Sequence, residues 1–404
     1  MASTNIYQPS AEILDKYAQV LVHFALGKDE GIAEGEVVQC MVPDVAKPLA
    51  LALQNTILKA GGHVLMRILP TGFDRDYYTL ASQEQLTFFP EAHLRTRADL
   101  INHSIGIIAD PFPDELSSVD PESIMLARNT QKPYRDWLVE KELNGNYTWT
   151  LALWGVPAKA KIVGLSLEEY WQQIIKACFL DMDDPIGEWR KIKKLQQKFR
   201  DKLNALSIEK VSMIGPDIDL EIALGANRQW KGGADRNIPS FELFTSPDWR
   251  GTNGHIRFNQ PLFRYGNVLD GIELEFKDGL ITKAHAEKGN SLLQTMIKSP
   301  NANKLGEFSL TDSRLSRINH FMAETLYDEN IGGPQGNTHV AIGMAYRDCL
   351  RGEKAKLTAA DWEALGFNDS PEHTDIISTE RRTVTATLTD GTQKVIYSDG
   401  KFVI

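Results

Sequence analysis

The spacing of apolar residues changes near residue 208, and this change constrains the fold more than any other feature of the chain. Before it, short β-rich runs alternate with segments whose apolar residues have helical spacing. After it, apolar and polar residues alternate with a period of two, which is typical of half-buried antiparallel strands. The sequence therefore predicts an α/β chain with two domains: an N-terminal open α/β sheet domain with two connecting helices at 1–207, and a C-terminal, mainly antiparallel β (α+β) domain at 208–404.

The N-terminal part contains one clear βαβ unit. Its strands are expected at 36–42 and 63–69, and the helix between them, 48–60, ends at a Gly-Gly pair that is typical of a helix C-cap. Further elements predicted from the same patterns are a helix after Ser10 and strands at 105–110 and 149–154. Neither a Gly-x-Gly-x-x-Gly motif nor a P-loop motif is present, so no nucleotide site is indicated.

Two helices are predicted to connect the domains. One opens at a capping box made by Ser166 and Glu169, and the other extends from Pro185 to about Leu206. The second helix has a basic face, which we interpret as a solvated face rather than a surface for anionic partners. In the C-terminal part, hairpins are predicted around Asp278-Gly279 and Asp390-Gly391.

Charge and cysteine content limit the function classes. The 404 residues include 54 Asp and Glu against 44 Lys and Arg, and this net charge of −10 argues against a nucleic-acid partner. The three cysteines form no C-x-x-C pair, which excludes a Cys-ligated zinc site and fits a reducing compartment. No run approaches 18 apolar residues and no signal-peptide pattern is present. We therefore expect a soluble cytoplasmic protein that has no membrane partner and binds a small molecule or peptide.

Two acidic residues lie where burial is expected. Glu242 and Glu307 are each the single acid inside a short, apolar, β-like run. A buried carboxylate without a partner costs several kcal/mol, so each of them requires a cation. Taken alone, each is also compatible with an outward-facing strand residue or a member of a salt bridge.

The segment 323–346 combines candidate ligands with a loop. We expect a helix to end near 328–330, a Gly/Pro loop to turn the chain, and Thr338 to cap a second helix. On that helix, His339 and Tyr346 would lie two turns apart on one face, with Gly343 leaving the face open between them. Such a face suits a metal or a substrate. The alternative is a satisfied core histidine and a packed tyrosine.

Two other pairs have ligand-like spacing. In His373-Thr-Asp375, residues two apart on a strand would share a face, so an imidazole and a carboxylate would point the same way; a surface pair is the alternative. His320 and Glu324 are four residues apart on a predicted helix. They belong to no larger pattern, and we interpret them as unrelated to a site.

Together these segments resemble the aminopeptidase T / aminopeptidase S family of dinuclear metallopeptidases, often called thermophilic aminopeptidases. The resemblance is carried by Phe-Glu-Leu-Phe-Thr-Ser-Pro, Leu-Gly-Glu, Glu-Thr-Leu-Tyr-Asp-Glu-Asn, His-Val-Ala-Ile-Gly-Met-Ala-Tyr and His-Thr-Asp. It implies a two-metal site with the ligands Glu242, Glu307, Glu329, His339, His373 and Asp375. It also implies that Tyr346 lies beside this site.

The resemblance implies a metal-dependent aminopeptidase, a hydrolase that removes N-terminal residues from short peptides and works as a homodimer with an enclosed chamber. The donor set lacks thiolates, which suits two divalent ions of zinc, cobalt, manganese or magnesium. Such ions would activate a water, with Glu329 moving its proton and Tyr346 donating to the oxyanion. Two alternatives stay open: an iron-dependent ring-opening dioxygenase on a similar fold, and a catalytically silent binding relative.

Overall fold

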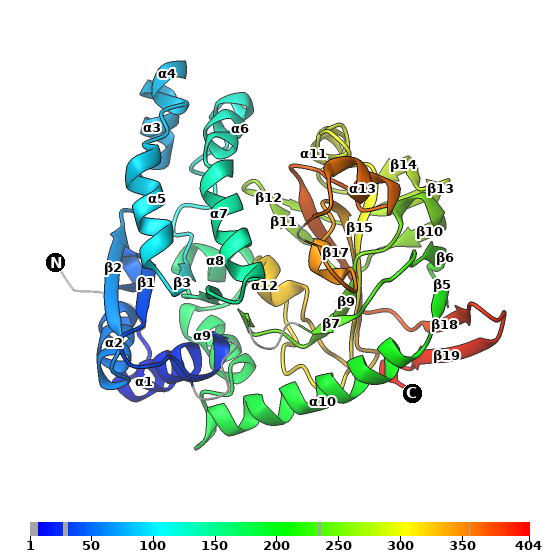
Figure 1. Ribbon diagram of the computed structural model, residues 1–404, viewed down its shortest axis with the longest axis horizontal. Coiled ribbons are helices and arrows are strands. Elements are labelled where there is room, and N and C mark those ends of the chain that lie inside the picture. Colours follow the sequence, from blue (N-terminus) through cyan, green and yellow to red (C-terminus); the bar gives the residue numbers. More distant parts are fainter. Residues whose placement is uncertain (1–6, 27–30, 233–235, 355) are drawn as a thin grey trace. The chain divides into compact units, whose positions relative to one another are not determined.

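The computed structural model describes residues 7–26, 31–232, 236–354 and 356–404 (Figure 1). The chain forms two compact units, Met1–Arg190 with Asp235–Ile238 and Lys191–Ala234 with Pro239–Ile404. Helix α10 (Pro185–Ala205) begins in the first unit and continues into the second. The division into domains at 1–207 and 208–404 stays a prediction. Among the described residues, every helix is too short or too polar to span a bilayer.

The first unit is built around a parallel sheet with the strand order β2-β1-β3-β4-β8. Its strands are β1 (Val37–Pro43), β2 (His63–Leu69), β3 (His103–Ile108), β4 (Thr148–Leu153) and β8 (Asn237–Ile238). The middle strand β3 is almost wholly buried, as expected inside a parallel sheet. The sheet confirms the predicted open α/β architecture. The predicted βαβ unit is formed by β1, α2 (Lys47–Lys59) and β2.

Two predicted helix starts are also confirmed in this unit. Ser10 caps α1 (Ala11–Val20) by accepting a hydrogen bond from the backbone N–H of Ile13, and Ser166 forms a capping box with Glu169 at the start of α9 (Leu167–Ala177). The other helical segments of the unit are η1 (Leu21–Ala25), η2 (Asp44–Ala46), α3 (Asp74–Leu80), α4 (Gln83–Leu86), α5 (Glu91–Leu100), α6 (Pro121–Thr130), α7 (Lys132–Leu143) and α8 (Pro157–Ile162). The sequence pattern did not indicate α3 to α7. Helices α3, α6 and α7 bury no residue fully, so they contribute little to the core of the unit.

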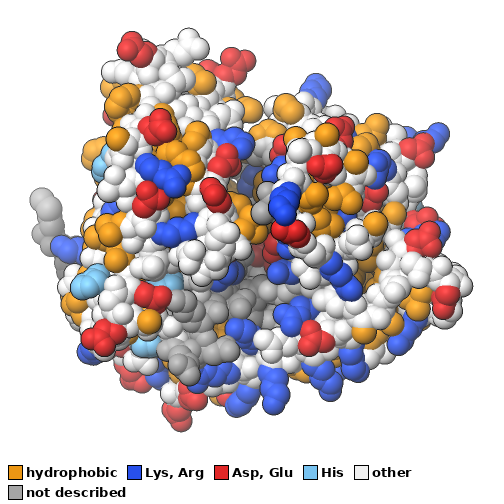
Figure 2. Space-filling model, in the orientation of Figure 1, with side chains coloured by type: hydrophobic (Ala, Val, Ile, Leu, Met, Phe, Trp, Pro, Cys, Tyr) orange, Lys and Arg blue, Asp and Glu red, His pale blue; other side chains and the backbone are white. Residues whose placement is uncertain are grey.

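Helix α10 has one buried and one solvated side. Trp189, Phe199 and Leu203 are buried, whereas Lys194 and Lys198 are exposed. Basic side chains gather along this helix in the space-filling view (Figure 2). The interpretation of its basic residues as the solvated face of a core-packed helix is therefore confirmed.

The second unit contains two antiparallel sheets and a hairpin, which confirms the predicted β-rich C-terminal part. The larger sheet has the order β14-β13-β10-β6-β5-β18-β19-β20, and its strands are β5 (Ile208–Gly215), β6 (Ile218–Ala223), β10 (Thr252–Arg257), β13 (Glu273–Lys277), β14 (Leu280–His285), β18 (Thr383–Leu388), β19 (Gln393–Ser398) and β20 (Lys401–Phe402). The smaller sheet, which we call the ligand sheet, has the order β17-β16-β15-β9-β7. Its strands are β7 (Lys231–Gly232), β9 (Glu242–Thr245), β15 (Leu305–Thr311), β16 (Asn337–Gly343) and β17 (His373–Ser378).

Short elements complete the second unit. They are the hairpin strands β11 (Leu262–Arg264) and β12 (Asn267–Leu269), the helices α11 (Asn290–Met296), α12 (Thr325–Asp328) and α13 (Ala359–Ala364), and the 3₁₀ turns η3 (Trp249–Gly251) and η4 (Arg347–Cys349). The predicted hairpin at Asp278-Gly279 joins β13 to β14, with φ values of 49° and 82° that suit a two-residue hairpin turn. The hairpin at Asp390-Gly391 joins β18 to β19.

One apolar core lies between the two sheets of this unit. Leu220 of β6 and Val384 of β18 belong to the same buried cluster as Phe308 of β15 and Val340 of β16. Successive side chains of a strand point to opposite faces. The residues that alternate with the core positions of the ligand sheet therefore project from its other face.

The predicted helix beginning at Thr338 is wrong, because residues 337–343 form β16, an inner strand of the ligand sheet between β15 and β17. In this segment β-branched Val340 and Ile342 alternate with His339 and Ala341, and the former pair packs in the core. A period of two is a strand pattern. The burial of Val340 and Ile342 in the core therefore favours a strand over a helix in this segment. The predicted helix containing His320 and Glu324 is also absent, since the chain is helical only from Thr325 to Asp328.

Candidate metal centre

The candidate ligands lie on the face of the ligand sheet that points away from the apolar core. On its strands they alternate with core residues, as in Glu242-Leu243, Glu307-Phe308, His339-Val340 and Asp375-Ile376. The strand register brings them together. Ala341 of β16 pairs with Glu307 of β15 on one side and with Asp375 of β17 on the other, and Thr311 of β15 pairs with Glu242 of β9.

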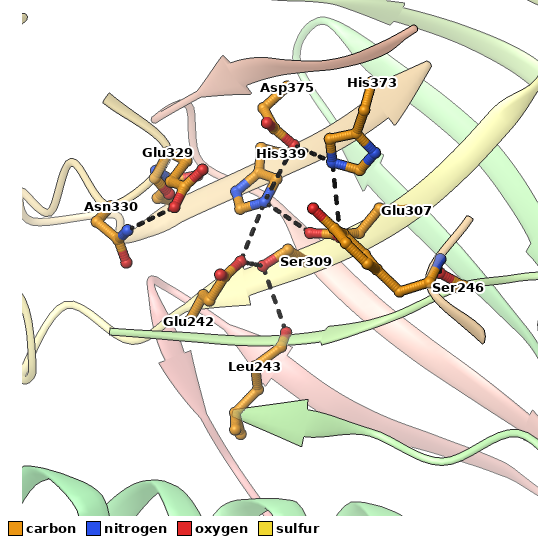
Figure 3. A network of polar contacts seen from close by, with 12 residues as sticks. Glu242, Leu243, Ser246, Glu307, Ser309, Glu329, Asn330, His339, His373 and Asp375 are labelled. Carbon is orange, nitrogen blue, oxygen red and sulfur yellow. Dashed lines mark hydrogen bonds and ion pairs between the residues drawn. The ribbon is translucent and has the colours of Figure 1, made fainter. Parts of the chain in front are cut away.

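His339 lies at the centre of this cluster (Figure 3). Its Nε2 is 3.2 Å from Glu242 Oε2, 3.2 Å from Glu307 Oε1 and 3.9 Å from Asp375 Oδ1. Glu242, Glu307 and His339 are all buried, and each offers a ligand atom within 4.8 Å of the other two. The three side chains therefore have the spacing of a group that can hold a metal ion.

His373 and Asp375 form the adjoining half of the cluster. They share one face of β17, as the H-x-D spacing predicted, and His373 Nε2 lies 3.4 Å from Asp375 Oδ1 and 3.9 Å from Glu307 Oε2. The other ring nitrogen, Nδ1, donates to the backbone carbonyl of Met344 at 2.8 Å. This hydrogen bond fixes the tautomer and directs Nε2 toward the carboxylates, as in many metal-binding histidines.

Glu329 approaches the cluster from outside the sheet. It is the C-cap residue of α12 and is 8% exposed. Asn330 Nδ2 donates to Glu329 Oε1 at 3.2 Å, while Asn330 Oδ1 accepts the backbone N–H of Phe241 at 2.6 Å. Asn337 Nδ2 also donates to the backbone carbonyl of Glu329 at 2.9 Å. Asn330 therefore connects Glu329 to the start of β9, directly before Glu242.

Ser309 is a member of the cluster that the sequence reasoning missed. Its hydroxyl donates to Glu242 Oε2 at 2.7 Å, and its side chain is fully buried (Figure 3). The signal was present, because Ser309 follows Glu307 by two residues on the same strand and must therefore share its face. Asn330 was missed as well, because its spacing from the other residues of the cluster follows no helix or strand period.

Tyr346 lies in the loop after β16, not on a helix with His339. Its ring centroid is 4.8 Å from that of His373 and 5.8 Å from that of Phe244, both edge-on. Its backbone N–H donates to Ser246 Oγ at 2.7 Å. The residue is 38% exposed, so one part of the side chain contacts solvent while the ring packs against the cluster.

Two small residues keep the ligand face uncrowded. Ala341 carries only a methyl group between Glu307 and Asp375. Gly343 has a φ of 102°, and a Cβ at this position would lie 2.1 Å from the carbonyl oxygen of Glu372. Gly343 is therefore required by the backbone next to His373. The sequence reasoning selected it for a different reason, as an open position on a helix.

The burial of several carboxylates perturbs their protonation. Burial raises the pKa of Glu307 to about 7, with His339 partly offsetting this and Glu242 adding to it. Burial and repulsion by Glu242 and Asp375 raise the pKa of Glu329 well above its usual range. Although 38% of Tyr346 is exposed, the packing of its ring side against the cluster and four surrounding carboxylates raise the pKa of its hydroxyl, which stays protonated at neutral pH.

The two imidazoles respond in the opposite way. Burial alone would lower the pKa of His339, but hydrogen bonds to Glu242 and Glu307 outweigh it and raise the pKa well above the usual value. The pKa of His373 is raised to about 9 against the effect of burial, mainly by Asp375. Burial would raise the pKa of Asp375, but His373 lowers it to about 2. In this cluster, protons on the imidazoles supply the positive charge that the carboxylates require.

The residues present fit a divalent cation. Oxygen and imidazole nitrogen donors, without thiolates, suit zinc, cobalt, manganese and magnesium. The pKa of Glu307 is raised mainly by burial, and a bound cation would stabilise its ionised form. The sheet positions Glu242, Glu307, His339, His373 and Asp375 as candidate ligands, and Glu329 lies beside them.

Comparisons with known proteins identify the family of the chain. A family model described as thermophilic metalloprotease (M29) matches residues 10–402. Aminopeptidase 2 of Geobacillus stearothermophilus is 28% identical over 96% of this chain and 97% of that protein, and aminopeptidase T of Thermus aquaticus is 26% identical over 97% and 99%. The solved structure of wild-type AmpT from Thermus thermophilus shares the fold, with a TM-score of 0.83 at 23% identity over 97% of this chain and 99% of that one. The chain belongs to the thermophilic metalloprotease (M29) family.

Proposed function

We propose that the protein is a metal-dependent aminopeptidase that releases N-terminal residues from short peptides. The observation that carries this proposal is the cluster of two imidazoles and four carboxylates on one side of the ligand sheet, in a chain of a metalloprotease family. Relatives matched over nearly their whole length are named aminopeptidases, which supports the exopeptidase assignment.

The charge of the cluster supports a site for two divalent ions. Glu242, Glu307, Glu329 and Asp375 carry four negative charges when ionised, and two divalent cations would balance them while the imidazoles stay neutral. His339 is 3.2 Å from both Glu242 and Glu307, and His373 is 3.4 Å from Asp375, so the cluster offers two groups of donors. Zinc, cobalt, manganese and magnesium are the candidates.

The side chains would divide the chemistry as follows. When bound, the metal ions would lower the pKa of a water molecule and polarise the peptide carbonyl. Glu329, whose pKa is raised by burial, would take the proton from this water and deliver it to the leaving amine. Tyr346 would donate its hydroxyl proton in a hydrogen bond to the oxyanion of the tetrahedral intermediate. The free α-amine of the substrate would be held by the acidic side of the cluster.

A matched pair of peptides tests the activity. We expect the metal-loaded protein to release the first residue from an unblocked pentapeptide and to leave its N-acetylated counterpart intact, because only the former has a free α-amine. Activity should disappear after treatment with a chelator and return with one of the four candidate ions. Glu329→Gln should lose at least about 100-fold in kcat through loss of the general base. Cleavage of both peptides would indicate an endopeptidase, and cleavage of neither would refute the proposal.

Metal content tests the ion count. We expect about two non-iron divalent ions per chain in elemental analysis of the active protein. A single iron would instead favour the ring-opening dioxygenase, for which a facial triad is sufficient. We also propose, from the family resemblance, that the protein is a cytoplasmic homodimer. Light scattering on the purified protein would test its mass in solution.

A further inference from the structure

The position of Tyr346 depends on a loop outside the ligand sheet. The residue lies between β16 and η4, and its backbone N–H donates to the buried hydroxyl of Ser246 at 2.7 Å. Ser246 follows β9, the strand that begins with Glu242. One hydrogen bond therefore connects the segment after Glu242 to the loop that carries Tyr346.

Ser246 is itself held by a buried arginine. Arg228 is 8% exposed, and its Nε donates to the backbone carbonyl of Ser246 at 2.6 Å. Its two terminal nitrogens donate to the carbonyls of Ala226 at 3.1 Å and Leu365 at 2.7 Å. The guanidinium carbon lies 3.7 Å from the ring centroid of Phe367. Three hydrogen bonds and one stacking contact thus fix the guanidinium in a single orientation.

The next residue holds the other end of the Tyr346 loop. The backbone N–H of Gln229 donates to the carbonyl of Cys349 at 2.8 Å, and its side-chain Nε2 donates to the carbonyls of Asp348 at 2.8 Å and Leu350 at 3.2 Å. The Arg228-Gln229 pair therefore contacts the chain both at Ser246 and directly after Tyr346.

The chemistry of Arg228 points to a positioning role. Burial lowers the pKa of Arg228 to about 10, and Asp248 only partly offsets this effect. The three hydrogen bonds of the guanidinium described above all go to backbone carbonyls, which belong to separate segments of the chain. Burying a cation is unfavourable because the charge loses its hydration. In this case the buried guanidinium fixes the geometry of the loops to which it is hydrogen-bonded.

We propose that Arg228 and Ser246 are positioning residues for Tyr346. They hold its backbone so that the ring stays against His373, with the hydroxyl available to the reacting carbonyl. The inference rests on the proposed function, in which Tyr346 donates to the oxyanion. Neither Arg228 nor Ser246 touches the substrate in this proposal.

A double-mutant cycle tests the catalytic consequence. Tyr346→Phe is expected to lower kcat about 100-fold through loss of one oxyanion donor. Arg228→Lys, which keeps the charge and loses the fork of donors, and Ser246→Ala, which loses the acceptor, should each lower kcat about 10-fold while KM and metal content change little. In the Tyr346→Phe background the same two substitutions should have almost no further effect on kcat, because residues that act through one group are not additive.

A second buried arginine provides the control. Arg382 is 2% exposed and donates to the carbonyl of Glu380 and the hydroxyl of Ser378, away from the Tyr346 loop. Arg382→Lys should destabilise the fold to a similar degree without lowering kcat. Equal losses of kcat in Arg382→Lys and Arg228→Lys, or full additivity with Tyr346→Phe, would overturn the proposal. If Arg228→Lys does not fold, the cycle is completed with Ser246→Ala.

Hydrogen exchange tests the geometry without using activity. The Tyr346 amide should be protected in the wild type and lose protection in Ser246→Ala, while Ser246→Thr should retain it because threonine keeps an acceptor hydroxyl. Unchanged protection in Ser246→Ala would overturn the positioning role even in an active enzyme. If the wild type cleaves no peptide but its Tyr346 amide is protected and loses protection in Ser246→Ala, the proposed function is refuted and the loop contact is established.

Discussion

Hydroxyl and amide groups orient the carboxylates of the metal centre one by one. Ser309 donates to Glu242, and Asn330 donates to Glu329, in both cases inside the protein where water does not compete. Groups of this kind commonly tune metal affinity by fixing the ligand in its binding orientation. Each of these hydrogen bonds is therefore a point at which a single substitution should change binding without removing a ligand.

Ser309→Ala is expected to weaken the affinity for the activating ion about 10- to 100-fold, because Glu242 loses the donor that orients it. Titration calorimetry on the metal-free protein measures this affinity, and Ser309→Thr should restore most of it. Thr311→Val is the matched control, since Thr311 lies two residues further on β15 and its hydroxyl has no hydrogen-bond partner among the described residues. An equal loss in Ser309→Ala and Thr311→Val would contradict the assignment.

Ala341→Leu is expected to abolish metal uptake, because three additional carbons would extend from β16 between Glu307 and Asp375. Overpacking of this kind costs about 1–3 kcal/mol in the free energy of unfolding. Elemental analysis gives the metal content, and circular dichroism shows whether the fold is retained. Ala341→Ser, which adds one atom, should bind metal normally. Full metal content in a folded Ala341→Leu protein would place the ions elsewhere.

At the level of the element, the inner strand β16 was the hardest part to predict. Thr-His-Val-Ala-Ile-Gly contains both a helical spacing and a period of two, and the sequence alone does not show that Val340 and Ile342 meet a core from a second sheet. By contrast, β9 and β15 coincide with the β-like runs expected around Glu242 and Glu307, and β17 is the strand on which the shared face of His373 and Asp375 depended. Contacts between distant segments, such as Asn330 with Phe241, have no local signal at all.

The end of β16 gives a test of backbone strain. Gly343→Ala combines a φ of 102° with a clash against the carbonyl of Glu372, so we expect a loss of about 2 kcal/mol or more in urea unfolding, together with weaker metal binding. Gly352→Ala is the control, since Gly352 also has a positive φ, 90°, but a Cβ there meets no atom within 4 Å. It should show the cost of the dihedral alone and normal metal binding. Identical behaviour of the two variants would mean that the contact with Glu372 is unimportant.

The capping box of α9 gives a prediction about pH. The backbone N–H and the hydroxyl of Ser166 donate to Glu169 at 2.8 Å and 2.7 Å, and they lower the pKa of Glu169. The ionised carboxylate therefore contributes stability that is complete above the unfolded-state pKa of about 4.3 and disappears as the pH falls through the lower folded-state pKa.

Glu169→Gln should consequently be less stable than the wild type at pH 6, and the difference in urea midpoint should shrink toward pH 3. Glu168→Gln, one residue earlier in the same turn, provides the control, because it leaves both hydrogen bonds between Ser166 and Glu169 in place. A difference for Glu169→Gln that grows on acidification would contradict the direction of the pKa shift.

For the whole molecule, the two-part organisation and the class of each part followed from hydrophobic periodicity, because a parallel sheet and an antiparallel sheet bury their strands differently. The five helices from α3 to α7 could not be predicted from hydrophobic periodicity, since three of them bury no residue fully. The six site residues were brought forward by a family resemblance. What the register of the ligand sheet adds is the meeting of five of these candidates on one face, while Glu329 reaches the cluster from the end of α12.

Metal removal should act on the second unit, which contains every candidate ligand. A ligand at 1,000 times its dissociation constant stabilises the folded state by about 4 kcal/mol, so the chelated protein should unfold at a clearly lower temperature in calorimetry. Hydrogen exchange should show increased opening in β9, β15, β16 and β17 and little change in the parallel sheet of the first unit. His339→Ala, which removes the central imidazole, should no longer respond to the chelator. Uniform destabilisation of both units would argue against a local site.

The alternation of ligands and core residues along the ligand sheet also affects folding. A shift of one residue in the pairing of β16 would turn His339 into the apolar core and Val340 out of it, and the same shift in β15 would bury Glu307. Misaligned sheets would therefore place charges in an apolar interior, and a metal ion would bind only the correctly aligned one. The cation would then act as a template that selects the native strand alignment during assembly, in addition to its part in catalysis.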